Sequence, residues 1–192
     1  MTLASSCFFD PTRGRTLVKV LPGEYYVTAG QELIGTTLGS CVCACLWDGE
    51  AGVGGLNHFM LPEAKGGLGP LSQANRYGTH AMESLVNGLL ALGARRDRLQ
   101  AKLFGGGQIY GEGRIGDQNI AFVEAFVAKE GIRVLARSLG GQQARKVLFE
   151  PCDGRAWVKH LRKLANDTLV LREDQLARQL AIKEDGKVEL FR

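Results

Sequence analysis

The chain has 192 residues, a length that fits one domain able to bury about 70 % of its unfolded surface. With 45 % hydrophobic and 23 % charged residues, its composition is that of an ordinary soluble globular protein. A net charge of +4 is too small to indicate nucleic-acid binding. The first 11 residues lack the features of a signal peptide and no apolar run approaches 18 residues, so we expect a cytoplasmic protein without membrane insertion.

The predicted elements, taken in chain order, indicate an α+β fold. Residues 1–14 show no regular pattern and are expected to be irregular, and short strands are predicted over 16–21, 25–29 and 32–38. A hairpin follows, with strands over 42–47 and 53–60 around the turn Asp48-Gly49-Glu50-Ala51. A helix is predicted from Ser72 or Asn75 to Gly93. The remaining elements are a strand (99–104), a helix (116–129), a strand (132–139) and a second hairpin (145–150 with 155–159). This order does not show regular βαβ alternation.

The character of the chain changes after Leu161, because residues 162–192 are highly charged. Within them Leu176 and Leu180 suit a short helix, and residues 183–191 suit a small hairpin around Asp185-Gly186. Packing against the domain, contact with a partner and disorder are all compatible with this composition.

The first hairpin carries a candidate nucleophile, Cys41, and a candidate base, His58. If the loop centres between Gly49 and Glu50, these two residues pair directly, with Cβ atoms about 4.5–5.5 Å apart on one face of the sheet. A register shift of two residues would keep them on one face, whereas a shift of one would separate them. An imidazole beside a thiol can lower the thiol's pKa and activate it.

The two residues before the candidate nucleophile, Gly39 and Ser40, favour a sharp bend, because glycine tolerates a positive φ. At such a bend the backbone N–H groups near Ser40 and Cys41 can point at a developing oxyanion. A free cysteine is also among the most often buried residues, so packing alone is an alternative role for Cys41.

The five cysteines are an odd and irregular set, typical of a reducing compartment rather than of a disulfide framework. Cys41, Cys43 and Cys45 alternate along one strand, where residues two apart lie roughly 6.5–7 Å from each other. A tetrahedral zinc site, with Zn–S near ~2.3 Å, needs its sulfurs closer than that. We therefore expect no metal, and Cys43 and Cys45 are interpreted as packing residues.

Five motifs in order resemble the CheD family of chemoreceptor glutamine deamidases. They are LGSC (38–41), GGLNHFMLP (54–62), KLFGGG (102–107), IGDQN (115–119) and the ending LGG-x5-VLFEP-x2-GRAWVK (139–159). The resemblance implies a three-layer α/β/β sandwich of the cysteine-dependent deamidase type. It also implies that the family domain covers 1–161, with 162–192 as a charged C-terminal extension.

The resemblance further implies a protein-glutamine glutaminase that forms a thioester on Cys41 with His58 as base, acts in chemotaxis adaptation and needs no cofactor. In the family, a threonine just upstream of the LGSC-like motif is the third catalytic residue. We assign this role to Thr36, with the adjacent Thr37 as the alternative. Gly39, Ser40, Asn57 and Gly106 are expected to bind substrate or the oxyanion, and Asn119 matches an asparagine of the family. The implied partners are methyl-accepting chemotaxis receptors and the CheC phosphatase. A non-catalytic adaptor and another Cys–His acyl hydrolase are the alternatives.

Overall fold

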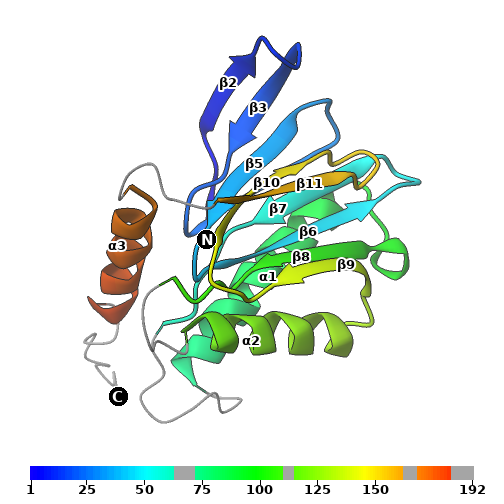
Figure 1. The fold of residues 1–192 in the computed structure, drawn as a ribbon. Helices are drawn as coiled ribbons and strands as arrows, with labels where there is room; N and C mark the ends of the chain where they lie inside the picture. Colours follow the sequence, from blue (N-terminus) through cyan, green and yellow to red (C-terminus); the bar gives the residue numbers. More distant parts are fainter. Residues whose placement is uncertain (63–71, 110–114, 162–167, 183–192) are drawn as a thin grey trace, which may run out of the picture.

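Two β-sheets and a pair of helices form three layers in the computed structural model, which describes residues 1–62, 72–109, 115–161 and 168–182 (Figure 1). The first sheet contains, in spatial order, β1 (Thr2–Leu3), β4 (Glu24–Thr28), β7 (Val53–Asn57), β6 (Val42–Asp48), β8 (Gln100–Gly105) and β9 (Arg133–Leu139). The second contains β11 (Ala156–Leu161), β10 (Ala144–Phe149), β5 (Leu33–Leu38), β3 (Arg15–Lys19) and β2 (Ser6–Asp10). The helices are α1 (Gln73–Ala91), α2 (Ile115–Lys129) and α3 (Thr168–Ile182), with a 3-10 turn η1 (Arg96–Arg98).

The central strand β6 separates the two hydrophobic cores, because its side chains alternate between the faces of the sheet. Val42, Ala44 and Leu46 pack against α1 and α2, whereas the side chains of Cys43 and Cys45 enter the core between the two sheets. All seven residues of β6 are buried. This order of helices, first sheet and second sheet confirms the predicted three-layer α/β/β arrangement.

The prediction that residues 1–14 are irregular was wrong. Residues 6–10 form β2, which pairs antiparallel with β3 at the edge of the second sheet, and β1 pairs parallel with β4. Backbone pairing rather than burial stabilises this edge, since Phe8 and Phe9 remain 50 % and 63 % exposed. The segment carries no burial pattern to read, which explains why its strands were missed.

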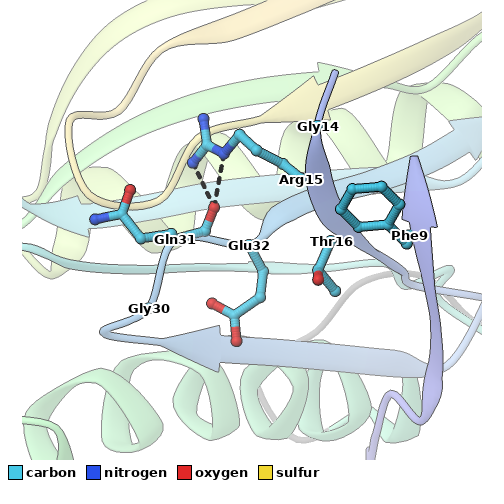
Figure 2. A pocket seen from close by; sticks show the side chains of 7 residues that line it. All are labelled: Phe9, Gly14, Arg15, Thr16, Gly30, Gln31 and Glu32. Atoms are coloured by element: carbon cyan, nitrogen blue, oxygen red, sulfur yellow. Dashed lines mark hydrogen bonds between the residues drawn. The ribbon is translucent and has the colours of Figure 1, made fainter. Parts of the chain in front are cut away.

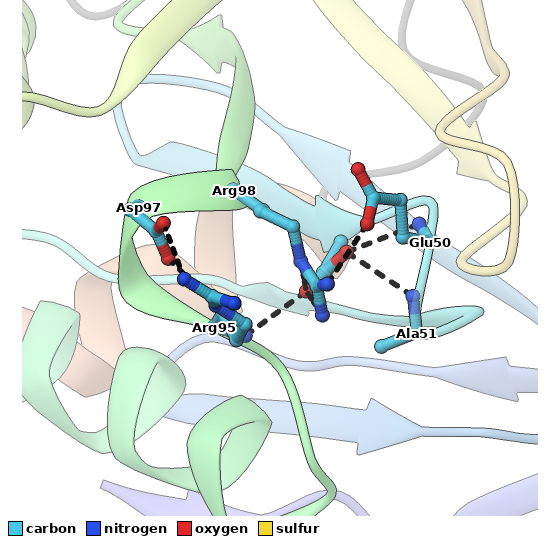
Figure 3. Close-up of polar contacts among 6 residues, drawn as sticks. Glu50, Ala51, Arg95, Asp97 and Arg98 are labelled. Atoms are coloured by element: carbon cyan, nitrogen blue, oxygen red, sulfur yellow. Dashed lines mark hydrogen bonds and ion pairs between the residues drawn. The ribbon is translucent and has the colours of Figure 1, made fainter.

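The buried carboxylate of Asp48 fixes the turn between β6 and β7. Figure 3 shows the turn residues Glu50 and Ala51 beside Arg95 and Arg98. One oxygen of the Asp48 carboxylate accepts hydrogen bonds from the Glu50 and Ala51 N–H groups at 3.0 and 3.1 Å. The other accepts from the Arg95 N–H and from the Arg98 guanidinium, both at 2.9 Å. Side-chain hydrogen bonds to nearby backbone groups are the usual way in which aspartate shapes a turn.

Helix α3 lies apart from the layer of α1 and α2, beside one end of the two sheets (Figure 1). It is the short helix suggested by Leu176 and Leu180, and both residues are buried. The hairpin predicted over 183–191 lies outside the described residues. No helix of the described ranges is both long and apolar enough to cross a bilayer.

Candidate active site

Register between β6 and β7 brings the candidate nucleophile and base to one face, two residues away from the predicted pairing. Asp48 lies opposite Val53, and the isolated bridge from Val42 to Phe59 continues the same register. His58 therefore lies across from Cys43, and Cys41 is its diagonal neighbour. The direct pairing was wrong because the loop comprises Gly49 to Gly52, one residue later than predicted, but a shift of two preserves the face.

Cys41 and His58 come together with a residue of the second sheet. His58 Nδ1 lies 2.8 Å from the hydroxyl of Thr36 on β5, and this hydroxyl also lies 2.8 Å from the Val20 carbonyl. Because the hydroxyl donates to the carbonyl, it accepts from Nδ1–H, which assigns the imidazole proton to Nδ1. Thr37 points to the other face of β5 by strand alternation, so Thr36 is the threonine that contacts the imidazole.

The Nε2 atom of His58 is buried and has no hydrogen-bond partner within the described residues. A ring nitrogen of His58, the Cys41 sulfur and a carboxylate oxygen of Glu173 all lie within 4.8 Å of one another. Since Nδ1 is held by Thr36, Nε2 is the nitrogen left to accept a proton from the thiol. An unpartnered basic nitrogen beside a sulfur is the arrangement that a Cys–His hydrolase requires.

Three successive backbone N–H groups, those of Gly39, Ser40 and Cys41, donate to the two oxygens of one carboxylate, that of Glu173. One oxygen of Glu173 accepts from Gly39 N at 2.7 Å and from Cys41 N at 3.4 Å. The other oxygen accepts from the Ser40 N–H at 2.9 Å and from the Ser40 hydroxyl at 2.7 Å. Such a concave set of donors binds an anion and suits the oxyanion of an acyl-transfer intermediate.

Hydrogen bonds to the carbonyl groups of residues 39–41 orient the three N–H groups of this loop. Gly107 N donates to the Gly39 carbonyl at 2.7 Å and Gly106 N donates to the Cys41 carbonyl at 2.7 Å. The Asn119 amide donates to the Ser40 carbonyl at 2.9 Å, while its oxygen accepts from Leu61 N at 2.8 Å. In a trans peptide the C=O and the following N–H point in opposite directions, so holding the carbonyls behind turns the N–H groups forward.

Asn119 therefore serves the site from α2, although our assignment of site residues did not include it. The signal was present in the sequence, because Asn119 ends the IGDQN motif. Only the fold shows that its amide connects the nucleophile loop with the segment that follows His58.

Glycine is required at two of the predicted positions for different reasons. Gly39 does not adopt the positive φ that we expected. Instead, a Cβ there would lie 2.2 Å from Ile109 Cδ1 and 2.8 Å from a Glu173 carboxylate oxygen, so the position must leave room for a group bound in the site. Gly106 has φ +68°, and a Cβ there would lie 2.5 Å from Ile120 Cγ1. Its backbone supports Cys41 from behind.

Asn57 lies elsewhere, on the helix side of the first sheet. Its oxygen accepts from Ala44 N at 2.9 Å, and its amide nitrogen donates to the Ala81 carbonyl at 3.1 Å. Strand alternation directs Asn57 and its neighbour His58 to opposite faces, so the expected contact of Asn57 with substrate is not retained. Its place is that of a fully satisfied buried amide connecting β6 and α1.

The thiol and the imidazole are both buried in this arrangement. Cys41 is 0 % exposed and His58 is 1 % exposed. Burial, followed by the negative charge of Glu173, raises the pKa of the Cys41 thiol well above its ordinary value. Burial lowers the pKa of His58 to about 4, although the Glu173 charge acts in the opposite direction. At neutral pH the pair is therefore a thiol and a neutral imidazole.

Glu173 is the site residue that sequence analysis missed entirely. It belongs to α3 in the C-terminal extension, more than 130 residues from Cys41, and is 2 % exposed. Cys41, His58 and Glu173 have the donor types of a zinc site. Both oxygens of the carboxylate are nevertheless taken by loop donors, so we assign the position to anion binding.

The pocket at the edge of the second sheet is separate from this site (Figure 2). Arg15 extends over it and donates to the Gln31 carbonyl, and it also pairs with Glu150 at 2.5 Å. Glu150, Cys152 and Asp153 form a second group of metal-type donors, but Arg155 pairs with both carboxylates of that group. Neither feature adjoins a nucleophile with a base.

Comparison with known proteins relates this chain to one family. A family model described as CheD chemotactic sensory transduction matches residues 60–160. A protein of Halorhodospira halophila is 49 % identical over 191 residues, covering 96 % of this chain and 88 % of its own. One of Methylobacillus flagellatus is 47 % identical over 195 residues, covering 98 % and 96 %. Both are named probable chemoreceptor glutamine deamidase CheD.

One solved structure, that of Neisseria meningitidis protein NMB0706, matches 62 % of this chain and 53 % of its own with 9 % identity and a TM-score of 0.39. A likeness at that level carries no argument. The family match covers more than half of the chain, and the relatives are nearly half identical along almost all of it. The chain therefore belongs to the CheD family.

Proposed function

We propose that this chain is a protein-glutamine deamidase that converts glutamine side chains of chemotaxis receptors to glutamate through a thioester on Cys41. The observation that carries the proposal is the convergence of three backbone N–H groups beside a cysteine and an unpartnered histidine nitrogen. The names of the relatives give the substrate class, chemoreceptor glutamine.

The reaction begins when His58 Nε2 takes the thiol proton and the Cys41 sulfur attacks the side-chain carbonyl carbon of the glutamine. The carbonyl oxygen becomes an oxyanion, which the N–H groups of Gly39, Ser40 and Cys41 stabilise. His58 then returns its proton to the amide nitrogen, the C–N bond breaks and ammonia leaves a glutamyl thioester.

Hydrolysis completes the cycle. His58 takes a proton from water, and the resulting hydroxide attacks the thioester carbon. The C–S bond breaks to give glutamate, and His58 returns the proton to the Cys41 sulfur. Thr36 acts through His58 as a positioning residue, since its hydroxyl fixes the proton on Nδ1 and leaves Nε2 basic. A glutamyl methyl ester offers the same acyl carbon, so a methylesterase side activity is expected.

The partners that follow from this function are the cytoplasmic regions of methyl-accepting receptors and, as a regulator, the CheC phosphatase. A second function, that of a non-catalytic adaptor, is favoured by one observation: the reactive pair is completely buried. The adaptor needs receptor binding without turnover, whereas another Cys–His hydrolase would cleave peptide bonds instead of side-chain amides.

Mass spectrometry of a receptor cytoplasmic fragment distinguishes the three. Deamidation adds about 1 Da per converted glutamine, because an amide NH2 becomes OH. We expect this gain with the wild type, none with Cys41→Ala, and near-normal gain with the control Cys43→Ala, which alters a buried thiol on the same face. Cleavage of the backbone would indicate a peptidase, and binding without any mass change would indicate the adaptor.

A further inference from the structure

Helix α3 places a glutamate side chain where the proposed reaction would leave one. The carboxylate of Glu173 accepts four hydrogen bonds from the nucleophile loop, and an oxygen of it lies within 4.8 Å of the Cys41 sulfur. Glutamate is also the product of glutamine deamidation. The Glu173 carboxylate therefore lies beside the thiol, on the donors that the proposed reaction would use for the substrate acyl group.

A buried carboxylate carries a large desolvation penalty unless it is well paired with donors. No cationic side chain is among the hydrogen-bond or ion-pair partners that the described residues offer to Glu173; its partners are backbone N–H groups and one hydroxyl. These are the groups that would hold an oxyanion during catalysis. The contact thus uses the catalytic binding determinants rather than a separate capping site.

The apolar side of α3 packs in the same core as the nucleophile. Leu176 and Leu180 follow Glu173 at helical spacing, and both enter the core between the sheets, which also contains Cys41. A Cβ at Gly23 would lie 3.4 Å from Leu176 Cδ1. The opposite side of the helix, including Asp174, is exposed. The contact is therefore one-sided, as expected of a helix laid in a groove.

Charge on the neighbouring surface opposes this docking. Partial burial and then the positive charges of Arg172 and Lys146 lower the pKa of Lys19. Like charges from α3, β3 and β10 are thus close enough to repel one another, which weakens the docked state. A competing helix with an acidic residue before its glutamine would remove this repulsion.

We propose that α3 is a tethered product mimic: it fills the active site with Glu173, and receptor helices that present a glutamine, followed by apolar residues three and seven positions later, compete with it. This inference rests on the proposed deamidase function. In the docked state the thiol is neutral and inaccessible, so receptor turnover requires α3 to leave. The concentration of receptor helix then sets the active fraction of the enzyme.

A single change turns the mimic into a substrate. In full-length Glu173→Gln the helix presents an amide to Cys41, and we expect intramolecular conversion back to glutamate, seen as a gain of about 1 Da in the peptide that contains residue 173. Gln175 and Gln179, exposed on the same helix, are internal controls and should stay unchanged. The double variant Cys41→Ala with Glu173→Gln should retain its amide.

Displacement is measured with the full chain carrying Leu176→Asp and Leu180→Asp. Iodoacetamide should alkylate Cys41 about tenfold faster or more than in the wild type, because the open state becomes the main one. Exposed Cys7 is the control thiol. Arg172→Glu tests the same equilibrium without touching the core: it should slow alkylation and receptor deamidation, whereas Arg172→Lys should change neither.

The results separate the two proposals. A wild type and an opened variant that both fail to deamidate receptor would refute the deamidase function, while the alkylation rates would still decide whether α3 covers the thiol. Receptor deamidation that is equally fast in both, with equal alkylation of Cys41, would overturn the covering role. A Glu173→Gln variant that keeps its new amide at this position while it converts receptor glutamines would overturn product mimicry.

Discussion

Replacing Thr36 with valine tests the hydrogen bond by which the second sheet holds the imidazole of His58. The change keeps the shape of the side chain and removes only the hydroxyl that lies 2.8 Å from both His58 Nδ1 and the Val20 carbonyl. A buried polar group left without a partner costs about 1–3 kcal/mol. The Val20 carbonyl is close enough to raise the pKa of the imidazole, so Nδ1–H can turn toward it. We therefore expect the lower end, a loss of about 1–2 kcal/mol in the free energy of unfolding.

The effect on catalysis follows from the same hydrogen bond. Without the hydroxyl the imidazole is free to rotate and to place its proton on Nε2, so kcat for receptor deamidation should fall by about 10- to 100-fold while KM changes little. Thr36→Ser keeps the oxygen and should retain most of the activity. The assay is ammonia release from a receptor fragment, with urea unfolding in parallel. A valine variant within twofold of wild-type kcat would refute the positioning role.

Three further outcomes are expected. Asn119→Ala removes the amide that donates to the Ser40 carbonyl, so kcat should fall by about tenfold while KM for the receptor fragment stays nearly unchanged. The neighbouring Gln118→Ala should leave kcat unchanged, and equal effects of the two changes would contradict the role of Asn119. Asp48→Ala should lower the free energy of unfolding by about 2–4 kcal/mol, because it leaves several buried donors without an acceptor. Asp97→Ala, at an exposed position, should lower it by under about 0.5 kcal/mol, and urea unfolding midpoints measure both changes. His58 has a pKa of about 4 in the folded chain against an ordinary 6.5, so the unfolded chain binds the proton first as the pH falls. The free energy of unfolding should therefore decrease by up to about 3 kcal/mol between pH 6.5 and pH 4. Urea titrations of His58→Asn should show a weaker dependence on pH.

Local patterns were enough to predict most of the elements, whereas the three-layer arrangement was implied by the family resemblance. The two apolar runs, over 42–47 and 53–60, and the turn chemistry around Asp48 predicted the central hairpin. Ser72 was one of two predicted caps for α1, and its hydroxyl accepts from Asn75 N at 3.1 Å. These features depend on neighbours within a few residues, which is the range over which sequence patterns are informative.

The register of the hairpin needed one more piece of information. Both a loop centred on Gly49 and Glu50 and the observed loop ending at Gly52 are compatible with the same turn residues. What selects the latter is Asp48, whose carboxylate receives Arg95 N and Arg98 from a distant segment. A tertiary contact thus determined the register of the hairpin. Because side chains alternate with a period of two residues, a shift of two still left Cys41 and His58 on the same face.

Family motifs could not predict the contribution of the C-terminal extension to the site. The motifs stop near Lys159, so Glu173 matched nothing and was one of many charged residues in an extension whose packing was left open. A physical signal was nevertheless present, since Glu173 precedes Leu176 and Leu180 at spacings of three and seven. That pattern fits a helix with a single buried face, and a buried face that includes a carboxylate needs a set of donors elsewhere in the chain. The nucleophile loop is such a set, because Gly39, Ser40 and Cys41 offer their N–H groups to any anion that fits. A site built to stabilise an oxyanion is therefore also a site that its own chain can occupy, and the only chemical difference between occupant and substrate is the amide of glutamine.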